Sequence, residues 1–527
     1  MRLRREFILS LTSKLALLSG PEKASLLRGI TRGIEKESLR VQANGQLATT
    51  AHQKALGSAL THPSITTDYS EALLEFITAA SSSIDEVLNE LDEIHRFTYR
   101  HIDDELLWVS SMPCQLGDNS SIPIAEYGSS NMGTLKSVYR VGLGNRYGRL
   151  MQTIAGIHYN FSIPEAMWSE LQAASGNNDS LQDFITAGYF ALIRNFRRHS
   201  WVLLYLLGSA PAVCKSFVHG RQHLLIPVGT DTHSLHTPYA TSLRMGDLGY
   251  QSDAQESLVV CYNGMAQYIK TLREALDQPH PAYDEIGLKD SEGNYRQLNT
   301  HLLQIENEFY SAIRPKRTAY SGERPLQALE QRGVEYIEVR CVDLNPSIAG
   351  GIDAETIRFL DTFLMFCLLQ DSPESNDEEY VQIQENINRT VYRGRDPETL
   401  LTSGNGEMLL RELGDVLLTE MQPVADLLDS ANHNDSYNES LTTMQQRMHD
   451  DSHTPAASLL QEMTDNNETY YAMAMRKAHE QREYFLKQPP SDETIAKYEH
   501  LASHSIQRQA EIEASDELSF DEFLARY

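Results

Sequence analysis

The chain has 527 residues, enough for about two to four domains, and 41% of them are hydrophobic, so a sizeable core is expected and wholesale disorder is excluded. Acidic residues number 73 against 45 basic ones, and the formal net charge of -28 argues against general affinity for nucleic acids or anionic membranes. A small anionic ligand is still compatible with this charge, because arginines, lysines and metal ions can reverse the field within one site.

The N-terminus, MRLRREFILSLTSKLALLSG, begins with basic residues and continues with an apolar stretch, as signal peptides do. Polar residues at positions 12–14 interrupt this stretch, and no A-x-A cleavage pattern follows it. The apolar residues Leu11, Leu15 and Leu18 instead fit one face of an amphipathic helix. We therefore expect a helical extension over residues 1–27, with a signal peptide as the alternative.

Three segments of the body have helical patterns. Residues 83–97 combine Ser83 and Glu86 at capping-box spacing with apolar residues that recur every three or four positions. Residues 181–206 and 355–370 are predicted to be largely buried helices. The apolar run WVLLYLLG is far shorter than the about 18 to 20 residues of a membrane span, so it is predicted to be core.

Stretches with few apolar residues predict exposed loops at 115–121, 174–180 and 371–379. A fourth such stretch, 430–454, is predicted to be a flexible connection. The sequence beyond it is rich in Glu, Gln and Ala and is predicted to be mostly helical. The expected organisation is a helical extension (1–27), a main body (28–429), a flexible segment (430–454) and a C-terminal helical region packed on the body (455–527).

The five cysteines are widely spread and include no C-x-x-C spacing, so a zinc site built from cysteines is not expected. Their odd number and the size of the chain suit a reducing cytosol. We therefore expect a cytoplasmic protein.

Two segments place polar side chains on one face of a strand, where residues two apart share a face. In GIEKESLR, Glu35 and Glu37 lie on the same face, whereas Lys36 points the other way and is interpreted as a bystander on the surface. In GIHYNFSI, His158 and Asn160 share one face, and apolar residues occupy the other.

Two further segments show the same alternation. In LLQIENEFY, residues 302–310, Glu306 and Glu308 lie on the face opposite the apolar residues. In EYIEVRCVDLN, Glu338 and Arg340 likewise lie opposite apolar residues. A sheet with one face on the core and the other in water produces such a pattern. Any one strand could belong to an ordinary exposed sheet face, but four together favour a cavity lined by carboxylates.

Clustered carboxylates repel one another and must be neutralised. Hard cations do this, and Mg²⁺ prefers oxygen ligands, with water and phosphate oxygens completing its octahedron. The pattern alone thus predicts a site for a polyvalent metal and phosphate, and no more.

Common nucleotide and nucleophile motifs are missing. No G-x-x-x-x-G-K-[ST], G-x-S-x-G or H-E-x-x-H occurs, and GLGNRYG at 142–148 has its third glycine one position late for a dinucleotide loop. We interpret it as a turn or helix start. A nucleotide would therefore be held by metal and arginine rather than by a glycine cradle.

Six motifs, in this order between residues 28 and 370, resemble the gammaproteobacterial type of the glutamate–cysteine ligase family. The N-terminal extension and residues 371–527 match less well. The motifs are RGIEKESLRV, ALGSALTHPSITTDYSEALLEFIT, NRYGRLMQTIAGIHYNFS, PYATSLRMGDLGY, LQIENEFYSAIRPKR and GVEYIEVRCVDLNP.

The resemblance implies an α+β fold like that of the glutamine synthetase catalytic domain, with an antiparallel sheet curved into a funnel and helices on its outer side. It also implies ATP at one end, amino acids at the other and about two or three Mg²⁺ ions between them, replaceable by Mn²⁺ in vitro. The implied catalytic residues are Glu35, Glu338 and Arg340. The implied metal ligands are Glu35, Glu37, Asp68, Glu75, His158 and Glu338.

The amino-acid pocket of the family maps onto eight residues, whose tyrosines would wall the cysteine site and whose arginines suit carboxylate or phosphate. The motif IRPKR supplies Arg314, Lys316 and Arg317, which either contact ATP phosphates or form a surface turn after a strand. The eight pocket residues are Tyr139, Arg140, Leu143, Gln152, Arg244, Tyr250, Tyr310 and Arg340.

The activity that the resemblance implies is the first step of glutathione synthesis. ATP phosphorylates the γ-carboxylate of L-glutamate, and the amine of L-cysteine then displaces phosphate from γ-glutamyl phosphate. Two alternatives are a ligase that uses another amine, such as ammonia, and a non-catalytic protein that binds metal or amino acid. A monomer without nucleic-acid or membrane partners is expected.

Overall fold

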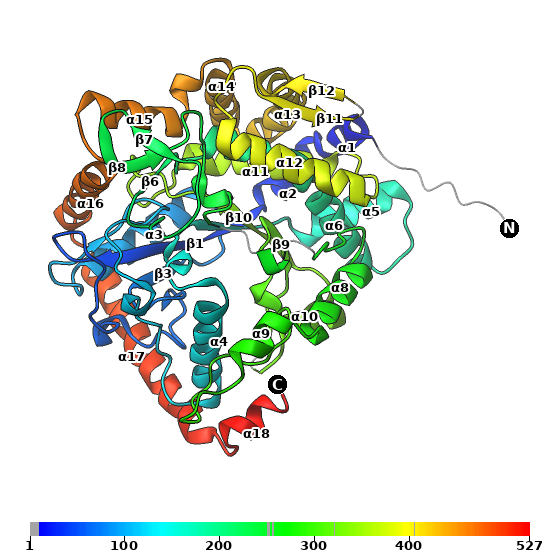
Figure 1. Ribbon diagram of the computed structural model, residues 1–527. Coiled ribbons are helices and arrows are strands. Elements are labelled where there is room, and N and C mark those ends of the chain that lie inside the picture. The colour runs from blue at the N-terminus through cyan, green and yellow to red at the C-terminus, as the bar shows by residue number, and fades with distance from the viewer. Residues whose placement is uncertain (1–9, 250–252, 256–257, 321, 405) are drawn as a thin grey trace.

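The computed structural model describes residues 10–249, 253–255, 258–320, 322–404 and 406–527, and it combines many helices with antiparallel sheets (Figure 1). The central sheet has the strand order β2-β3-β1-β5-β10-β9, with β4 paired to β1 off this path. Its strands are β1 (Thr31–Val41), β2 (Ile65–Thr67), β3 (Leu73–Ile77), β4 (Leu106–Leu107), β5 (Ile157–Ser162), β9 (Ile313–Lys316) and β10 (Tyr336–Val342).

The register of the central sheet brings the polar residues of neighbouring strands onto one face. Glu35 on β1 is opposite His158 on β5, and Asn160 on β5 is opposite Glu338 on β10. The alternate residues, such as Ile34 on β1, are fully buried on the other face. The alternation that the sequence predicted for β1, β5 and β10 is therefore confirmed.

Helices cover the apolar face of the sheet, and α11 is almost completely buried among them (Figure 1). It packs against α6, α13 and α14, while α3, α6 and α7 contact the strands directly. These helices are α3 (Ile84–Tyr99), α6 (Leu181–His199), α7 (Trp201–Leu207), α11 (Ala354–Leu369), α13 (Leu410–Asn432) and α14 (Ser436–His449).

A buried polar network ties the sheet to α11. Arg32 on β1 donates through Nη2 to Oδ2 of Asp361 over 2.8 Å, and the hydroxyl of Tyr159 on β5 donates to Oδ1 over 2.6 Å. All three side chains are almost completely buried. Because a buried ion pair is costly to break on one side, this network constrains how β1 and β5 sit on α11.

Lys36 is buried, so its interpretation as a surface bystander was wrong. Its Nζ lies 2.7 Å from Nε2 of His95 on α3, and His95 Nδ1 donates to the carbonyl of Leu91. Nε2 is therefore left to accept from the lysine. Burial lowers the pKa of Lys36 to about 7. The prediction failed because Lys36 points to the face of β1 that packs on α3, where His95 provides a polar partner.

The predicted helices are observed with small shifts. Residues 83–97 lie in α3, residues 181–206 form α6 and α7 with a break at Ser200, and residues 355–370 lie in α11. The N-terminal helix is α1, with one short helix after it. The helices at the two ends of the chain are α1 (Leu11–Leu18), α2 (Ala24–Arg28), α15 (Pro455–Asp465), α16 (Tyr470–Lys487), α17 (Asp492–Ser515) and α18 (Phe520–Leu524).

Two segments differ from their predictions. Residues 302–310 form no strand; they are irregular around a short 3-10 helix at Glu306–Glu308, and the strand lies further on, as β9 in the IRPKR motif. The stretch predicted to be flexible contains α14, which packs on α11 and α13 through a sparse stripe of buried residues. The polar composition hid this stripe, which includes Tyr437, Leu441 and Met444.

The other elements surround this core. A three-stranded sheet has the order β6-β8-β7, and β11 pairs with β12. The strands are β6 (Ala212–Cys214), β7 (Ile226–Val228), β8 (Asp231–His236), β11 (Leu400–Ser403) and β12 (Gly406–Leu409), and the helices are α4 (Asn131–Tyr147), α5 (Glu165–Ser175), α8 (Met265–Asp277), α9 (Pro281–Ile286), α10 (Pro325–Arg332) and α12 (Asp377–Arg393).

Cys114 and Cys214 form a disulfide with Cα atoms 5.4 Å apart, whereas the other three cysteines are free. The number of cysteines had suggested a reducing cytosol, where disulfides are rare, so this pairing between residues 100 positions apart was not expected. Among the helices of the described residues, none is long and apolar enough to cross a membrane.

Candidate active site

The polar face of the central sheet gathers a cluster of possible metal ligands. One ligand atom from each of Glu35, Glu75 and His158 lies within 4.8 Å of the other two. Glu37 joins them, because it is opposite Glu75 in the register of β1 and β3. Three neighbouring strands therefore bring four of the six predicted metal ligands together.

His158 has one ring nitrogen engaged and one unengaged. Nδ1 lies 3.2 Å from Oε2 of Glu35, whereas Nε2 lies 3.7 Å from Oε1 of Glu37. This Nε2 is buried and has no hydrogen-bond partner within the described part of the chain. A buried polar atom without a partner is unusual, and an imidazole nitrogen beside carboxylates is a good metal ligand.

The carboxylates of the cluster are held close to one another without enough positive charge. Burial raises the pKa of Glu75 well above its usual value, and the charges of Glu35 and Asp68 raise it further. Burial also raises the pKa of Glu37, although its Oε2 accepts a 2.7 Å hydrogen bond from the backbone N–H of Gly156. Oxygen ligands with surplus negative charge suit a hard divalent cation, so the donor set fits one.

The remaining predicted metal ligands border the cluster. Asp68 follows β2, and its charge raises the pKa of both Glu37 and Glu75. Glu338 on β10 is almost fully buried. Burial and the charge of Glu338 both raise the pKa of Glu35, but the hydrogen bond and charge of His158, together with the charge of Lys316, hold that pKa below its usual value.

Two cations stand beside Glu338. Nζ of Lys316 on β9 lies 3.1 Å from Oε1 of Glu338, and Nη1 of Arg340 on β10 lies 3.1 Å from Oε2. Burial would raise the pKa of Glu338, but these two charges hold it well below its usual value. The polar face thus has a carboxylate-rich part next to a part that can bind an anion.

The arginines of the IRPKR motif face different surroundings. Arg314 on β9 is opposite Glu338 in the register, and its Nη2 donates to the carbonyls of Asn307 and Phe309. Arg317 donates to the carbonyls of Arg332 and Gly333 and to the side chain of Gln182, away from the cluster. For Arg317, these contacts favour the interpretation as a turn after the strand over a contact with ATP phosphates.

The predicted pocket residues Tyr139, Arg140 and Leu143 lie on α4. Nε of Arg140 donates to the carbonyl of Asp68 over 2.5 Å, and the guanidinium lies over the ring of Tyr127, 4.5 Å from its centre. These contacts fix α4 beside the segment that supplies Asp68. The pocket residues on α4 are therefore next to the metal-ligand segment after β2.

Gln152 and Tyr310 meet although they are far apart in the sequence. Nε2 of Gln152 donates to the hydroxyl of Tyr310 over 3.1 Å, and the ring of Tyr147 packs edge-on against Tyr310. Tyr250 lies outside the described residues. These contacts join the segment before β5 to the segment before β9.

Arg244 is fully buried behind β10 rather than on an open wall. Its Nη2 donates to the carbonyl of Arg340 over 2.8 Å, and its Nη1 lies 3.6 Å from Oδ1 of Asp343. A side chain at Gly156 would collide with the guanidinium, so this glycine is required for the close approach. In this arrangement Arg244 supports the strand that carries Glu338 and Arg340.

Some residues of the site carried little or no signal of their role. Asn160 donates through Nδ2 to Oε1 of Glu35 over 2.9 Å; its position on the polar face was predicted, but not this role. The N–H of Gly156 binds Glu37 through the backbone, which side-chain patterns do not reveal. Glu306 and Glu308 were expected on the polar face, but they pair elsewhere, with Arg324 and Arg146.

Known proteins resemble this chain along nearly its whole length. A family model described as glutamate–cysteine ligase matches residues 15–390. The glutamate–cysteine ligase of Alcanivorax borkumensis is 49% identical over 98% of this chain and 99% of its own length, and that of Saccharophagus degradans is 50% identical over 96% of each. A crystal structure of glutamate–cysteine ligase from Francisella tularensis in complex with AMP is 37% identical, with a TM-score of 0.89 over 95% of this chain and 97% of that one.

Proposed function

The chain belongs to the glutamate–cysteine ligase family, and from this we infer that it joins the γ-carboxylate of L-glutamate to the amine of L-cysteine at the expense of ATP. It is a ligase that forms a carbon–nitrogen bond in the first step of glutathione synthesis. The observation that most supports this activity is the carboxylate cluster beside Lys316 and Arg340 on one face of the sheet.

The donor set fits Mg²⁺, and we propose that about two or three ions bind at this cluster. When bound, the ions would neutralise the charge of the carboxylates and of the ATP phosphates. The unpartnered Nε2 of His158 is the structural feature that supports a metal here. The residues that would hold the ions are Glu35, Glu37, Asp68, Glu75, His158 and Glu338.

Lys316 and Arg340 would bind the γ-phosphate of ATP and the γ-carboxylate of glutamate. Both partners of the first step are anions, so cations must hold them in line for attack of the carboxylate oxygen on phosphorus. Glu338 keeps both cations in place over 3.1 Å contacts before the substrates arrive. Arg314, held by backbone carbonyls beside Glu338, would add positive charge near the ATP phosphates.

The second step needs the cysteine amine next to the acyl carbon of γ-glutamyl phosphate. We propose that Tyr139 and Tyr310 wall the cysteine site, with Tyr250 as a further tyrosine outside the described residues, and that Leu143 and Gln152 complete the amino-acid pocket. Arg140 and Arg244 would act largely by holding α4 and β10, since their guanidinium groups contact backbone carbonyls. The amine displaces phosphate directly, so no protein nucleophile is required.

The overall arrangement is also part of the proposal. We expect the central sheet to curve into a funnel, with ATP entering at one end and the amino acids at the other. A cytoplasmic monomer is the simplest form of the enzyme.

Release of ADP in the presence of glutamate, cysteine and ATP tests the function. Glu35→Gln and Glu338→Gln should each abolish this release while the protein stays folded, because each removes a charge at the proposed metal site. Glu483→Gln, at an exposed ion pair with Lys487, is the matched control and should keep full activity. Wild-type rates in both site variants would disprove the assignment.

The same assay separates the alternatives. Ammonia in place of cysteine would support ADP release if the enzyme uses another amine. Binding of ATP with Mg²⁺ but no turnover with any amine would instead indicate a non-catalytic protein.

A further inference from the structure

The last twelve residues of the sequence, 516–527, form a segment that contains α18 and lies against α4 (Figure 1). We refer to residues 516–527 as the C-terminal segment. It belongs to the region that matched the family least well in the sequence. Helix α4 carries Tyr139, which we have placed in the cysteine site.

The C-terminal segment caps the start of α4. A carboxylate oxygen of Asp516 accepts a 2.5 Å hydrogen bond from the backbone N–H of Asn131, the first residue of the helix. The side chain of Asn131 in turn donates to the carbonyl of Leu518 over 2.9 Å. A negative charge at a helix N-terminus is favourable, so Asp516 both orients and stabilises this end of α4.

The C-terminal segment also packs against the side of α4. Phe520, Phe523, Leu524 and Tyr527 share one hydrophobic cluster with Leu135 and Val138 of α4. Tyr139 belongs to this cluster and also packs against the main core. Tyr139 therefore lies between two packed regions, and the C-terminal segment contributes side chains to one of them.

The C-terminal segment also contacts a second part of the chain, residues 289–306. Asp521 accepts from Nζ of Lys289 over 3.0 Å and from the hydroxyl of Tyr295 over 2.6 Å. Within the same stretch, Nε2 of Gln304 donates to the carbonyl of Tyr139 over 3.2 Å. The segment thus bridges α4 and a separate stretch of chain that contacts Tyr139 directly.

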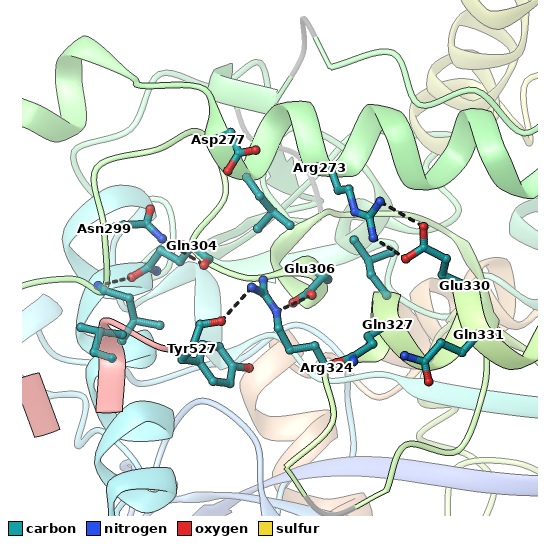
Figure 2. Close-up of a pocket in the computed structure, with 14 residues that line it drawn as sticks. Arg273, Asp277, Asn299, Gln304, Glu306, Arg324, Gln327, Glu330, Gln331 and Tyr527 are labelled. Carbon is teal, nitrogen blue, oxygen red and sulfur yellow. Dashed lines mark hydrogen bonds and ion pairs between the residues drawn. The ribbon is translucent and has the colours of Figure 1, made fainter. Parts of the chain in front are cut away.

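Arg324 completes this bridge at the edge of a cavity of about 580 Å³ (Figure 2). Figure 2 shows its guanidinium between Glu306 and Tyr527: Nε donates to Oε1 of Glu306 over 2.8 Å, and Nη1 donates to the carbonyl of Tyr527 over 2.9 Å. The guanidinium also lies over the ring of Tyr527, 5.2 Å from its centre.

We propose that the C-terminal segment positions Tyr139 and thereby sets the affinity of the enzyme for its cysteine substrate. This rests on the proposed function, which places Tyr139 in the cysteine site. No residue of the segment touches the reacting atoms in this account. The segment acts through α4 and the Gln304 contact, so its loss should affect cysteine more than ATP.

Phe523→Ala in the full-length chain tests the proposal, because it empties part of the cluster without removing a charge. We expect KM for cysteine to rise about tenfold, since small displacements of a positioning side chain are costly, while KM for ATP changes less than about twofold. Phe523→Leu refills the space and should restore most of the affinity for cysteine.

Phe184→Ala is the matched control, since Phe184 is also partly buried and packs against Trp168, away from α4. Thermal unfolding measures the loss of stability in both variants. A purely structural role predicts that both variants lose stability and keep the wild-type KM for cysteine.

The proposal is overturned if folded Phe523→Ala keeps its KM for cysteine within about twofold of wild type, or if the KM values for cysteine, glutamate and ATP all rise together. A wild-type enzyme that releases no ADP with glutamate and cysteine would overturn the proposed function itself. That outcome is recognised in the wild-type assay, before any variant is compared.

Discussion

Replacing Glu75 with glutamine removes one negative charge from the carboxylate cluster at nearly constant volume. Burial raises the pKa of Glu75 well above its usual value, and the charges of neighbouring carboxylates add to this. The glutamine amide therefore resembles the neutral form that the cluster favours in the absence of a cation.

The size of the effect follows from the geometry of the cluster. The ligand atoms of Glu35 and Glu75 lie within 4.8 Å of each other, and two unit charges at that limit repel by about 3 kcal/mol at an effective dielectric constant of about 20, which water partly screens at a partly exposed site. Without metal, the Glu75→Gln protein should therefore be up to about 3 kcal/mol more stable than wild type. The gain should grow as the pH rises, because wild-type Glu75 then loses the proton that relieves the repulsion.

Mg²⁺ should offset most of this difference between the two proteins. At about 100 times its Kd it would stabilise wild type by about 2.7 kcal/mol, which is about 2 to 3 °C for a chain of 527 residues. Glu75→Gln should lose most of this shift, because it lacks a charged ligand.

Thermal unfolding in EDTA and in a Mg²⁺ titration measures both effects, with Glu483→Gln as a control that changes an exposed charge. A Glu75→Gln protein that is less stable than wild type without metal would refute the electrostatic reasoning. A full Mg²⁺ shift in this variant would refute the role of Glu75 as a ligand.

Three further predictions concern stability and ATP. Asp361→Ala should lower the free energy of unfolding by about 3–5 kcal/mol in chemical denaturation, because it leaves Arg32 buried without its partner. Burial lowers the pKa of His62 to about 4, so its ring stays neutral in the folded protein at a pH where it is protonated in the unfolded chain. The free energy of unfolding should therefore fall by about 3 kcal/mol as the pH falls from about 6.5 to 4, and His62→Asn should remove this loss. Lys316→Met should lower kcat by at least about 100-fold, whereas Arg317→Met should change kcat by less than about twofold and lower the melting temperature.

Each of these predictions has a result that contradicts it. Wild-type stability of Asp361→Ala would show that the buried network contributes nothing. An unchanged acid limb in His62→Asn would assign that proton uptake to other groups. Equal losses of kcat in Lys316→Met and Arg317→Met would mean that both side chains act at the phosphates.

The polar face of the sheet was predictable because strands impose a two-residue period on it. Glu35 and Glu37 lie two residues apart on β1, whereas His158 and Glu338 alternate with apolar neighbours, and antiparallel pairing then places them on one face. Glu75 lies in a strand of five residues, too short to show this period clearly. Its role could be predicted only from the family resemblance.

The failures have physical causes as well. Glu306 and Glu308 alternate as strand residues do, yet a short 3-10 helix turns them towards arginines on other elements. Lys36 points to the face of β1 opposite the carboxylates. Helix α3 packs on that face, and a neutral His95 accepts the hydrogen bond of Lys36. Local periodicity cannot reveal such partners, because they come from distant parts of the chain.

Release of ADP by the purified full-length protein, with glutamate, cysteine and ATP, decides whether the carboxylate cluster and its cations perform ligation. We predict release that requires cysteine and stops when Mg²⁺ is removed by a chelator, with γ-glutamylcysteine formed in equal amount to ADP. Release at the same rate without cysteine, or without divalent metal, would contradict it.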